Sequence, residues 1–484
     1  MGAGMIATIA AAELRLMLRS RLALVGLATL LLLSAIAAIT SAVQMSTAAI
    51  ARADAQAITD AQFKSQPDRH PHRMVHYGTY ALRPVGSLAA FDPGVDAFTG
   101  TVLFLEGHRQ NSATFGAARE SSDLVRFGQL TPAFVLQTLA PLLLVFLGFA
   151  TVARERESGS LRALRAHGAS AATILGGKAI ALAAVAGIAM LPALIALLWA
   201  AARMPGEAAV AALTALAYAA YLLVWVLAIV AGSALARTAQ GALVGLIAAW
   251  AIIVVLVPRA AAGWAGLAEP LPSRVDTEFA IAADLRTLGD SHNANDPHFA
   301  AFKAGVLKQY GVSRVEDLPV NYRGIQAMEG ERLTAKLFDE YGARADAIQL
   351  GQSARLAAFG LLSPALTVRR ASMLAAATDL ATHLDFMRQA EAYRFDLVQR
   401  LNRLQAEAVS GADDGARSRD PIADRRTRIS ADFWRSMPEF AFVQRSPARR
   451  AEAMLPPLGI LILWLAAAAV LFGFGIRRVG SDAA

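Results

Sequence analysis

The stretch RERESGSLRALRAHGASAATILGGK, residues 154–178, separates two apolar runs that contain no charged residue. The run before it covers residues 131–153 and the run after it covers residues 179–202. A helix needs about 20 consecutive apolar residues to cross the hydrocarbon core of a bilayer. Both runs are therefore predicted membrane-spanning helices, and the charged stretch is predicted to be a loop that joins them outside the lipid.

The whole chain fits this interpretation. Of its 484 residues 56% are hydrophobic and only 17% are charged, whereas soluble domains are about a quarter charged. Continuous apolar runs of this length indicate helices, because the strands of membrane barrels are shorter and alternate in polarity. The sequence thus predicts an all-α polytopic membrane protein with six spans, at residues 22–43, 131–153, 179–202, 209–234, 241–258 and 455–476.

The first span resembles a secretory signal, since three arginines precede it. Its apolar run is longer than the apolar region of a cleaved signal, so an uncleaved anchor is the favoured interpretation. The weakly polar segment 44–61 that follows is able to prolong this helix beyond the membrane.

Basic residues in the short segments predict the orientation. With the N-terminus placed inside, the inner segments carry 11 Lys and Arg residues and 4 Asp and Glu residues. Their net charge of +7 is nearly all of the net charge of +8 of the whole chain. Basic residues prefer the cytoplasmic side, so both termini and the loop 154–178 are predicted to be cytoplasmic. The high isoelectric point then reports topology and gives no sign of nucleic-acid binding.

Two long polar segments, 44–130 and 259–454, are then extracytoplasmic. Segment 259–454 shows apolar residues at helical spacing over much of its length, and its charged part 411–426 is predicted to be a loop. We expect both segments to build one mainly helical outer domain. The predicted division is 1–43 (N-terminal segment and first span), 44–130 (first insert), 131–258 (spans two to five), 259–454 (second insert) and 455–484 (last span and tail).

The sequence lacks the residues that several classes of activity need. The six predicted spans contain no ionisable side chain, which disfavours ion-coupled transport, proton relays and intramembrane proteolysis. The sequence GGKA at 176–179 is no nucleotide-binding loop, because Ala172 replaces the first required glycine and Ala179 replaces the Ser or Thr. The chain is therefore predicted to be non-catalytic and to hold no cofactor, so any ATP hydrolysis belongs to another chain.

The charged loop itself is predicted to contain a short helix. Ser158 or Ser160 is expected to cap it, and Gly168 to end it. Leu161 and Leu164 would share one face of this helix. Lys178 is expected to anchor the next span at the membrane interface. A plain basic loop that only obeys the charge rule is the alternative interpretation.

From Glu155 the loop reads E-R-E-x-G-[ST]-L-R-x-L-R-x-x-G-x-[ST]-x-x-x-x-L-x-G-K, which resembles the loop between spans two and three of ABC-2 type transporter permeases. Three further pieces, 91–111, 309–324 and 361–394, resemble a bacterial subgroup of these permeases with large extracytoplasmic helical inserts of unassigned function. The similar pieces are spread over most of the chain, from residue 91 to residue 394.

This resemblance implies a function. In the family the loop holds a coupling helix that docks on a separate ATPase, which binds ATP and Mg²⁺. A six-span chain is half of such a transporter, so the implied partners are two ATPase chains and a second permease, identical or related, in the bacterial inner membrane. A membrane-anchored receptor or scaffold with a partner-binding outer domain is the alternative. The expected ATPase-coupling residues are Glu155, Glu157, Gly159, Leu161, Leu164 and Gly168.

Histidines gather in the first outer segment. His70, His72 and His76 lie within RHPHRMVH, and His108 follows later. Imidazole is a good ligand for zinc or copper, but an exposed polar loop is the favoured interpretation, so the sequence assigns no metal ligand. A second group open to the same two interpretations is Asp290, His292, Asp296 and His298.

Overall fold

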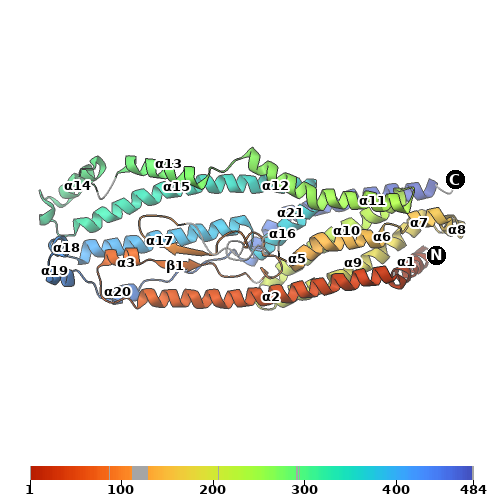
Figure 1. Cartoon of the computed structure of the whole chain (residues 1–484), viewed down its shortest axis with the longest axis horizontal. Helices are drawn as coiled ribbons and strands as arrows, with labels where there is room; N and C mark the ends of the chain where they lie inside the picture. The colour runs from red at the N-terminus through yellow and green to blue at the C-terminus, as the bar shows by residue number, and fades with distance from the viewer. Residues whose placement is uncertain are drawn as a thin grey trace.

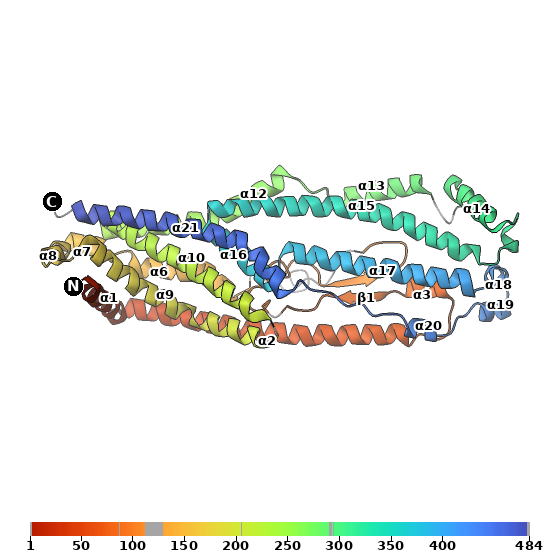
Figure 2. The same cartoon turned by 180° about the vertical axis from the view of Figure 1, so that it is seen from behind.

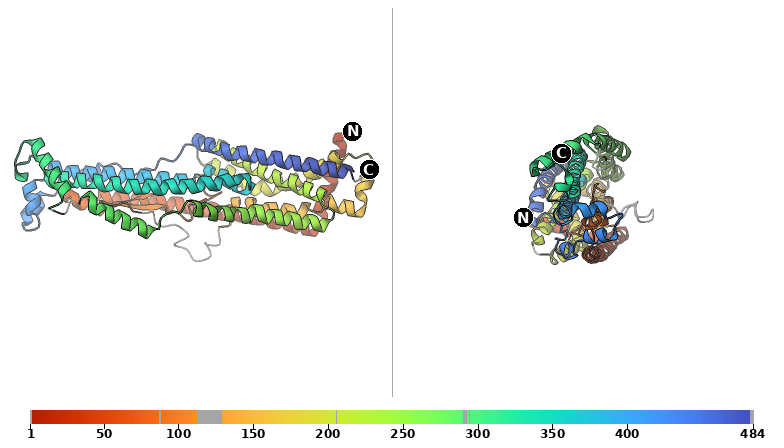
Figure 3. Two further views of the ribbon diagram at one scale, coloured as in Figure 1. Left: turned by 90° about the horizontal axis from the view of Figure 1, so that it is seen from above. Right: turned by 90° about the vertical axis from the view of Figure 1, so that its left-hand side faces the viewer.

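The computed structural model describes residues 2–86, 88–111, 129–204, 206–289, 293 and 295–481. It is an elongated molecule in which a helix bundle at one end continues into a mainly helical domain at the other (Figures 1 and 2). Both termini lie at the free end of the bundle, next to α7 (Ala153–Ser158) and α8 (Ser160–Ala166) (Figure 1). The end-on view in Figure 3 shows how narrow the molecule is across its long axis.

Among the described residues, six helices are long and apolar enough to cross a membrane, and they confirm the six predicted spans. Two of the spans are composite, with a π-helical segment between α-helical parts. The second consists of α5 (Pro132–Phe134), η2 (Val135–Leu139), α6 (Ala140–Gly148) and α7, and the fifth of α11 (Ala239–Trp250), η3 (Ala251–Leu256) and α12 (Val257–Ala268). The other four are α2 (Arg21–Lys64), α9 (Ala171–Ala201), α10 (Glu207–Leu235) and α21 (Pro447–Ser481).

The helices extend beyond the apolar runs that predicted them. Helix α2 continues through the weakly polar segment into the outer domain, as its composition allows, and a separate helix α1 (Gly2–Arg19) precedes it. Helix α9 begins at Ala171, because the hydroxyl of Ser170 accepts a hydrogen bond from the backbone N–H of Thr173 at 3.0 Å. The last eight residues of the predicted loop are therefore already helical.

Each of the two π-helical segments has a backbone carbonyl that accepts a hydrogen bond from a side chain of another helix or its cap. Tyr221 on α10 donates its hydroxyl proton to the carbonyl of Gln137 in η2 at 2.7 Å. Ser363 donates to the carbonyl of Ile253 in η3 at 2.7 Å, and it also caps α16 (Pro364–Ala376). Within a membrane such carbonyls need an internal partner, since no water is available.

Both long polar segments contribute to one outer core. Phe63, Met74 and Val75 come from the first segment, and they pack in the same cluster as Leu401 and Trp434 from the second. The first segment supplies the end of α2, α3 (Pro71–Tyr77) and an antiparallel pair of strands, β1 (Thr79–Leu82) and β2 (Val102–Leu105), in which Thr79 pairs with Leu105.

The second segment supplies the long helices of the outer domain. Helices α15 (Tyr322–Ala358) and α17 (Leu380–Ala408) run side by side along it, connected through η5 (Phe359–Leu361) and α16 (Figures 1 and 2). Asn321 caps α15 by accepting a hydrogen bond from the N–H of Arg323 at 3.0 Å. The remaining elements of the segment are α13 (Arg274–Leu288), α14 (Pro297–Tyr310), η4 (Val315–Asp317), α18 (Gly411–Ala416), α19 (Pro421–Arg426) and α20 (Asp432–Arg435).

One prediction for this segment is wrong. Residues 411–426 were expected to form a loop, but they contain the short helices α18 and α19. Ser410 and Asp420 cap these helices through their side-chain oxygens. The turn-forming residues thus mark helix ends here, because Ser and Asp favour caps as strongly as turns.

Candidate functional site

The charged stretch forms an elbow of two short helices at the free end of the bundle. Helix α7 ends at Gly159, whose φ of 77° is left-handed, and α8 begins at the next residue. Gly168, with φ of 86°, follows α8. These two backbone angles favour glycine. The predicted short helix is therefore confirmed.

The predicted serine cap is wrong. Gly159 occupies the cap position, and no side chain caps α8. The hydroxyl of Ser158 instead donates to the carbonyl of Glu155 at 3.3 Å and lies 2.7 Å from the hydroxyl of Ser160. The two serines therefore stabilise the elbow between the helices.

A buried cation holds the elbow against the bundle. The side chain of Lys178 on α9 is only 1% exposed, and its ammonium group donates to Glu155 Oε1 and Glu13 Oε2, both at 2.8 Å. Glu13 also accepts a hydrogen bond from Thr151. Lys178 thus joins α1, α7 and α9 within the bundle, and its role as an anchor at the membrane interface stays a prediction.

The glycine before this lysine lets α1 approach α9. A Cβ atom at Gly177 would lie 2.7 Å from Ile9 Cγ2 and 3.1 Å from the carbonyl oxygen of Ile6. A side chain there would force α1 away from α9 and lengthen the contacts of Glu13. The GGK sequence that superficially suggests a phosphate loop is therefore explained by helix packing and one buried ion cluster.

Three other side chains attach α7 to the following helices through hydrogen bonds. Arg156 donates to the carbonyls of Ala234 and Ala236 at 2.5 and 2.6 Å, at the C-terminal end of α10, where unpaired carbonyls need donors. The hydroxyl of Ser233 accepts from the N–H groups of Val152 and Ala153 at 3.0 and 3.1 Å. Glu157 accepts from the N–H of Ala239 at the start of α11 at 3.1 Å.

The six expected coupling residues divide into two groups. Glu155 pairs with Lys178, and Leu161 is 3% exposed within the buried bundle cluster, with Leu164 packed against that cluster. Glu157, Gly159 and Gly168 are exposed. The leucines thus hold α8 against its own chain. The surface that the elbow presents to solvent consists of Arg154, Glu157, Ser158, Gly159, Ser160, Arg162, Ala163, Ala166 and His167.

The sequence interpretation missed the residues that position the elbow. Glu13 and Ser233 contact the elbow or its lysine from outside α7 and α8, and Thr151 donates to Glu13. Arg156 in α7 reaches out to α10. One signal was available, because Glu13 is the only acidic residue ahead of the first span. A carboxylate that becomes buried between helices needs a cation as partner.

Comparison with known families identifies the chain. The family described as ABC-2 family transporter protein matches residues 7–283, and a domain of unknown function (DUF3526) matches residues 276–443. Comparisons with curated proteins and with solved structures find no match. The first match covers more than half of the chain and includes five of the six spans and the elbow. The chain therefore belongs to the ABC-2 family and is a multi-pass membrane permease component of an ABC transporter.

Proposed function

We propose that this permease is driven by a separate ABC ATPase that docks on the elbow of α7 and α8, in an exporter-like transporter. The observation that carries the proposal is the attachment of α7. Its side chains or backbone contact α9, α10 and α11, and α1 joins them through the shared Lys178. A displacement of the elbow would therefore move several spans together, which is what coupling to an ATPase requires.

The family and the charge distribution support the proposed assembly. ABC-2 permeases work with an ABC ATPase, and we propose two ATPase chains, which carry ATP and Mg²⁺, and a second permease, identical or related. We place the assembly in the bacterial inner membrane. The excess of Lys and Arg in the short inner segments supports a cytoplasmic elbow and cytoplasmic termini. The outer domain, from both long inserts, would then be extracytoplasmic.

The exposed face of α8 offers a direct test of docking. We expect Ala163→Glu with Ala166→Glu to reduce permease-stimulated ATPase activity at least tenfold, which is about 1.4 kcal/mol of coupling. Both alanines are exposed, and glutamate suits a helix, so the fold should not change. The measurement is ATP hydrolysis by the ATPase that copurifies from native membranes, with and without the permease variant.

Ala412→Glu is the matched control, because Ala412 is also exposed on a short helix but lies in the outer domain. It should leave ATPase stimulation unchanged. Substituting Leu161 and Leu164 by aspartate is a poorer test, because Leu161 is buried and its loss would disrupt the elbow itself. Docking at the elbow is refuted when the α8 double variant copurifies with the ATPase and stimulates it like the unmodified permease.

A further inference from the structure

Three histidines from separate parts of the first outer segment meet at one point. His72 and His76 are one turn apart on α3, so both lie on the same face of that helix. His108 belongs to the turn that follows β2. Each can offer one ring nitrogen such that the three nitrogens lie within 4.8 Å of one another.

The spacing suits a tetrahedral metal ion. Nε2 of His72 and Nε2 of His76 are 3.2 Å apart. Two nitrogens bound to one tetrahedral zinc ion at 2.0–2.1 Å would be about 3.3 Å apart. The ring centres of His76 and His108 are 5.2 Å apart, and those of His72 and His108 are 5.9 Å apart. All three rings are thus near enough to contact one ion after small side-chain rotations.

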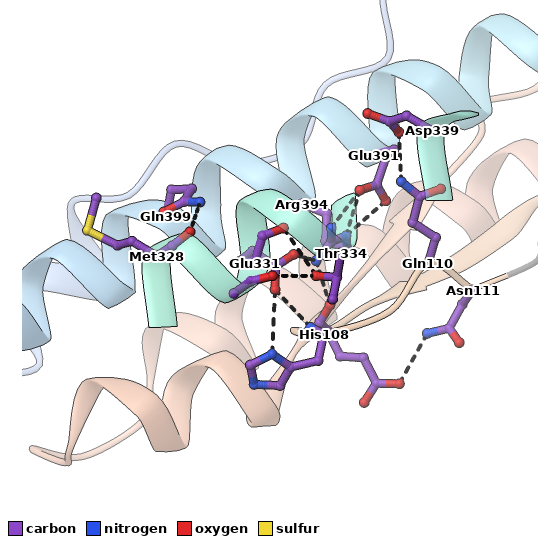
Figure 4. Close-up of polar contacts among 12 residues, drawn as sticks. His108, Gln110, Asn111, Met328, Glu331, Thr334, Asp339, Glu391, Arg394 and Gln399 are labelled. Atoms are coloured by element: carbon purple, nitrogen blue, oxygen red, sulfur yellow. Dashed lines mark hydrogen bonds and ion pairs between the residues drawn. The ribbon is translucent and has the colours of Figure 1, made fainter. Parts of the chain in front are cut away.

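His108 is held in place by a buried ion pair. Its φ of 70° is unusual for a residue other than glycine, and its backbone N–H donates to Glu331 Oε2 at 2.9 Å (Figure 4). Glu331 is fully buried, lies 3.7 Å from His108 Nδ1 and accepts from Arg394 at 2.6 Å. Arg394 also donates to the carbonyl of Glu106 at 3.0 Å. This arrangement fixes a strained backbone, as often occurs at binding sites.

A carboxylate beside a ligating imidazole is also a common feature of metal sites, because it orients the ring. Glu331 on α15 has this position relative to His108 (Figure 4). The site would thereby connect α3 and the β2 turn to α15, and through Arg394 to α17.

The other candidate ligands have different roles. His70 caps α3 by accepting from the N–H of His72 at 3.1 Å, and its Nε2 lies 3.2 Å from Asp414. Asp296 caps α14, and His298 lies 3.2 Å from Glu329. Asp290 and His292 lie outside the described residues. His72 and His76 are therefore close in space, His108 joins them, and His70 does not. The favoured interpretation of this stretch as an exposed polar loop is wrong, because residues 71–77 form α3 and His70 is buried.

The chemistry of the three rings selects the ion. A neutral imidazole binds a metal ion through the lone pair of one ring nitrogen. Imidazole suits zinc and copper, whereas calcium and magnesium prefer oxygen ligands. The chain contains no cysteine, so a site of the thiolate class is excluded.

We propose that His72, His76 and His108 bind one divalent transition-metal ion of the zinc and copper class in the outer domain. Three protein ligands leave a coordination position for water or for a further ligand. Such an ion would add a second link between α3 and the β2 turn, next to the hydrogen bond from the N–H of Gly107 to the carbonyl of Val75 at 3.2 Å.

The test is titration of the purified, tag-free full-length protein with Zn²⁺ by isothermal calorimetry, repeated with Cu²⁺. We expect one ion per chain for at least one of the two metals. His76→Gln should weaken binding by more than tenfold, since even loss of an outer partner of a ligand costs about 10–100-fold. His76 is exposed, so this change should not affect folding. His108→Asn should act alike, because asparagine tolerates the same backbone conformation.

His298→Gln is the matched control, because it removes a histidine that also lies near a carboxylate. It should leave the affinity and stoichiometry unchanged. Two results overturn the proposal: no binding of either ion by the unmodified protein, or binding that persists at full affinity in both His76→Gln and His108→Asn. Neither result bears on the ATPase docking test, so the two proposals fail independently.

Discussion

The Lys178→Ala variant is expected to lose about 3–5 kcal/mol of folding free energy, because it leaves two carboxylates without their cation. Lys178 is buried, and it is the shared donor to Glu13 and Glu155. Repulsion between the two carboxylates would separate α1 and α7 from α9. The measurement is thermal unfolding in lipid nanodiscs, together with amide hydrogen exchange, which should rise in α1 and in the elbow.

A neutral version of the same cluster is the control. Replacing buried ionic groups together with neutral groups of similar size is often nearly harmless, so Glu13→Gln, Glu155→Gln and Lys178→Met combined should recover most of the stability. A single Lys178→Ala variant with unchanged unfolding and exchange would show that the cluster does not hold the elbow.

The second large effect is expected in the outer domain. Trp434→Ala should cost about 3–5 kcal/mol, the usual loss for a large buried aromatic. Trp434 is fully buried beside Val75 and Leu401, and its ring N–H donates to the carbonyl of Gln66 at 2.8 Å. The side chain thus joins the two polar inserts, and its removal should make the outer domain sensitive to limited proteolysis while the bundle stays protected.

The neighbouring Phe433 provides the comparison for this change. It is 46% exposed, so Phe433→Ala should alter the proteolysis pattern little. Equal sensitivity of the two variants would mean that the core shared by the two inserts does not depend on Trp434.

Much of the bundle could be predicted, because hydropathy reports lipid-crossing helices directly. The six spans needed only the apolar runs. Their ends could not be predicted in the same way, since α2 continues as a polar helix to Lys64 and α9 starts at a serine cap before its apolar run. The π-helical segments also left no signal, because their carbonyls find partners such as Ser363, more than 100 residues away.

The elbow was predictable as a local helix but not as a packed one. Lysine at the edge of an apolar run usually reaches toward water. Lys178 instead pairs with two carboxylates, and one of them, Glu13, lies 165 residues away in the sequence. Leu161 and Leu164 were expected on one face of the helix and among the coupling residues, and nothing local shows that this face packs on the bundle. His72 and His76 could be paired by their helical spacing, whereas His108 joins them only through the fold.

The absence of cysteine from this chain allows a direct test of ATPase docking on the elbow. A single cysteine would be introduced as Ala163→Cys on α8 or, for comparison, as Ser418→Cys in the outer domain, both at exposed positions. A thiol- and amine-reactive cross-linker would then be applied to native membranes. The account predicts capture of the ATPase from Ala163→Cys alone. Capture from Ser418→Cys, or from neither although both cysteines react with the reagent, would contradict it.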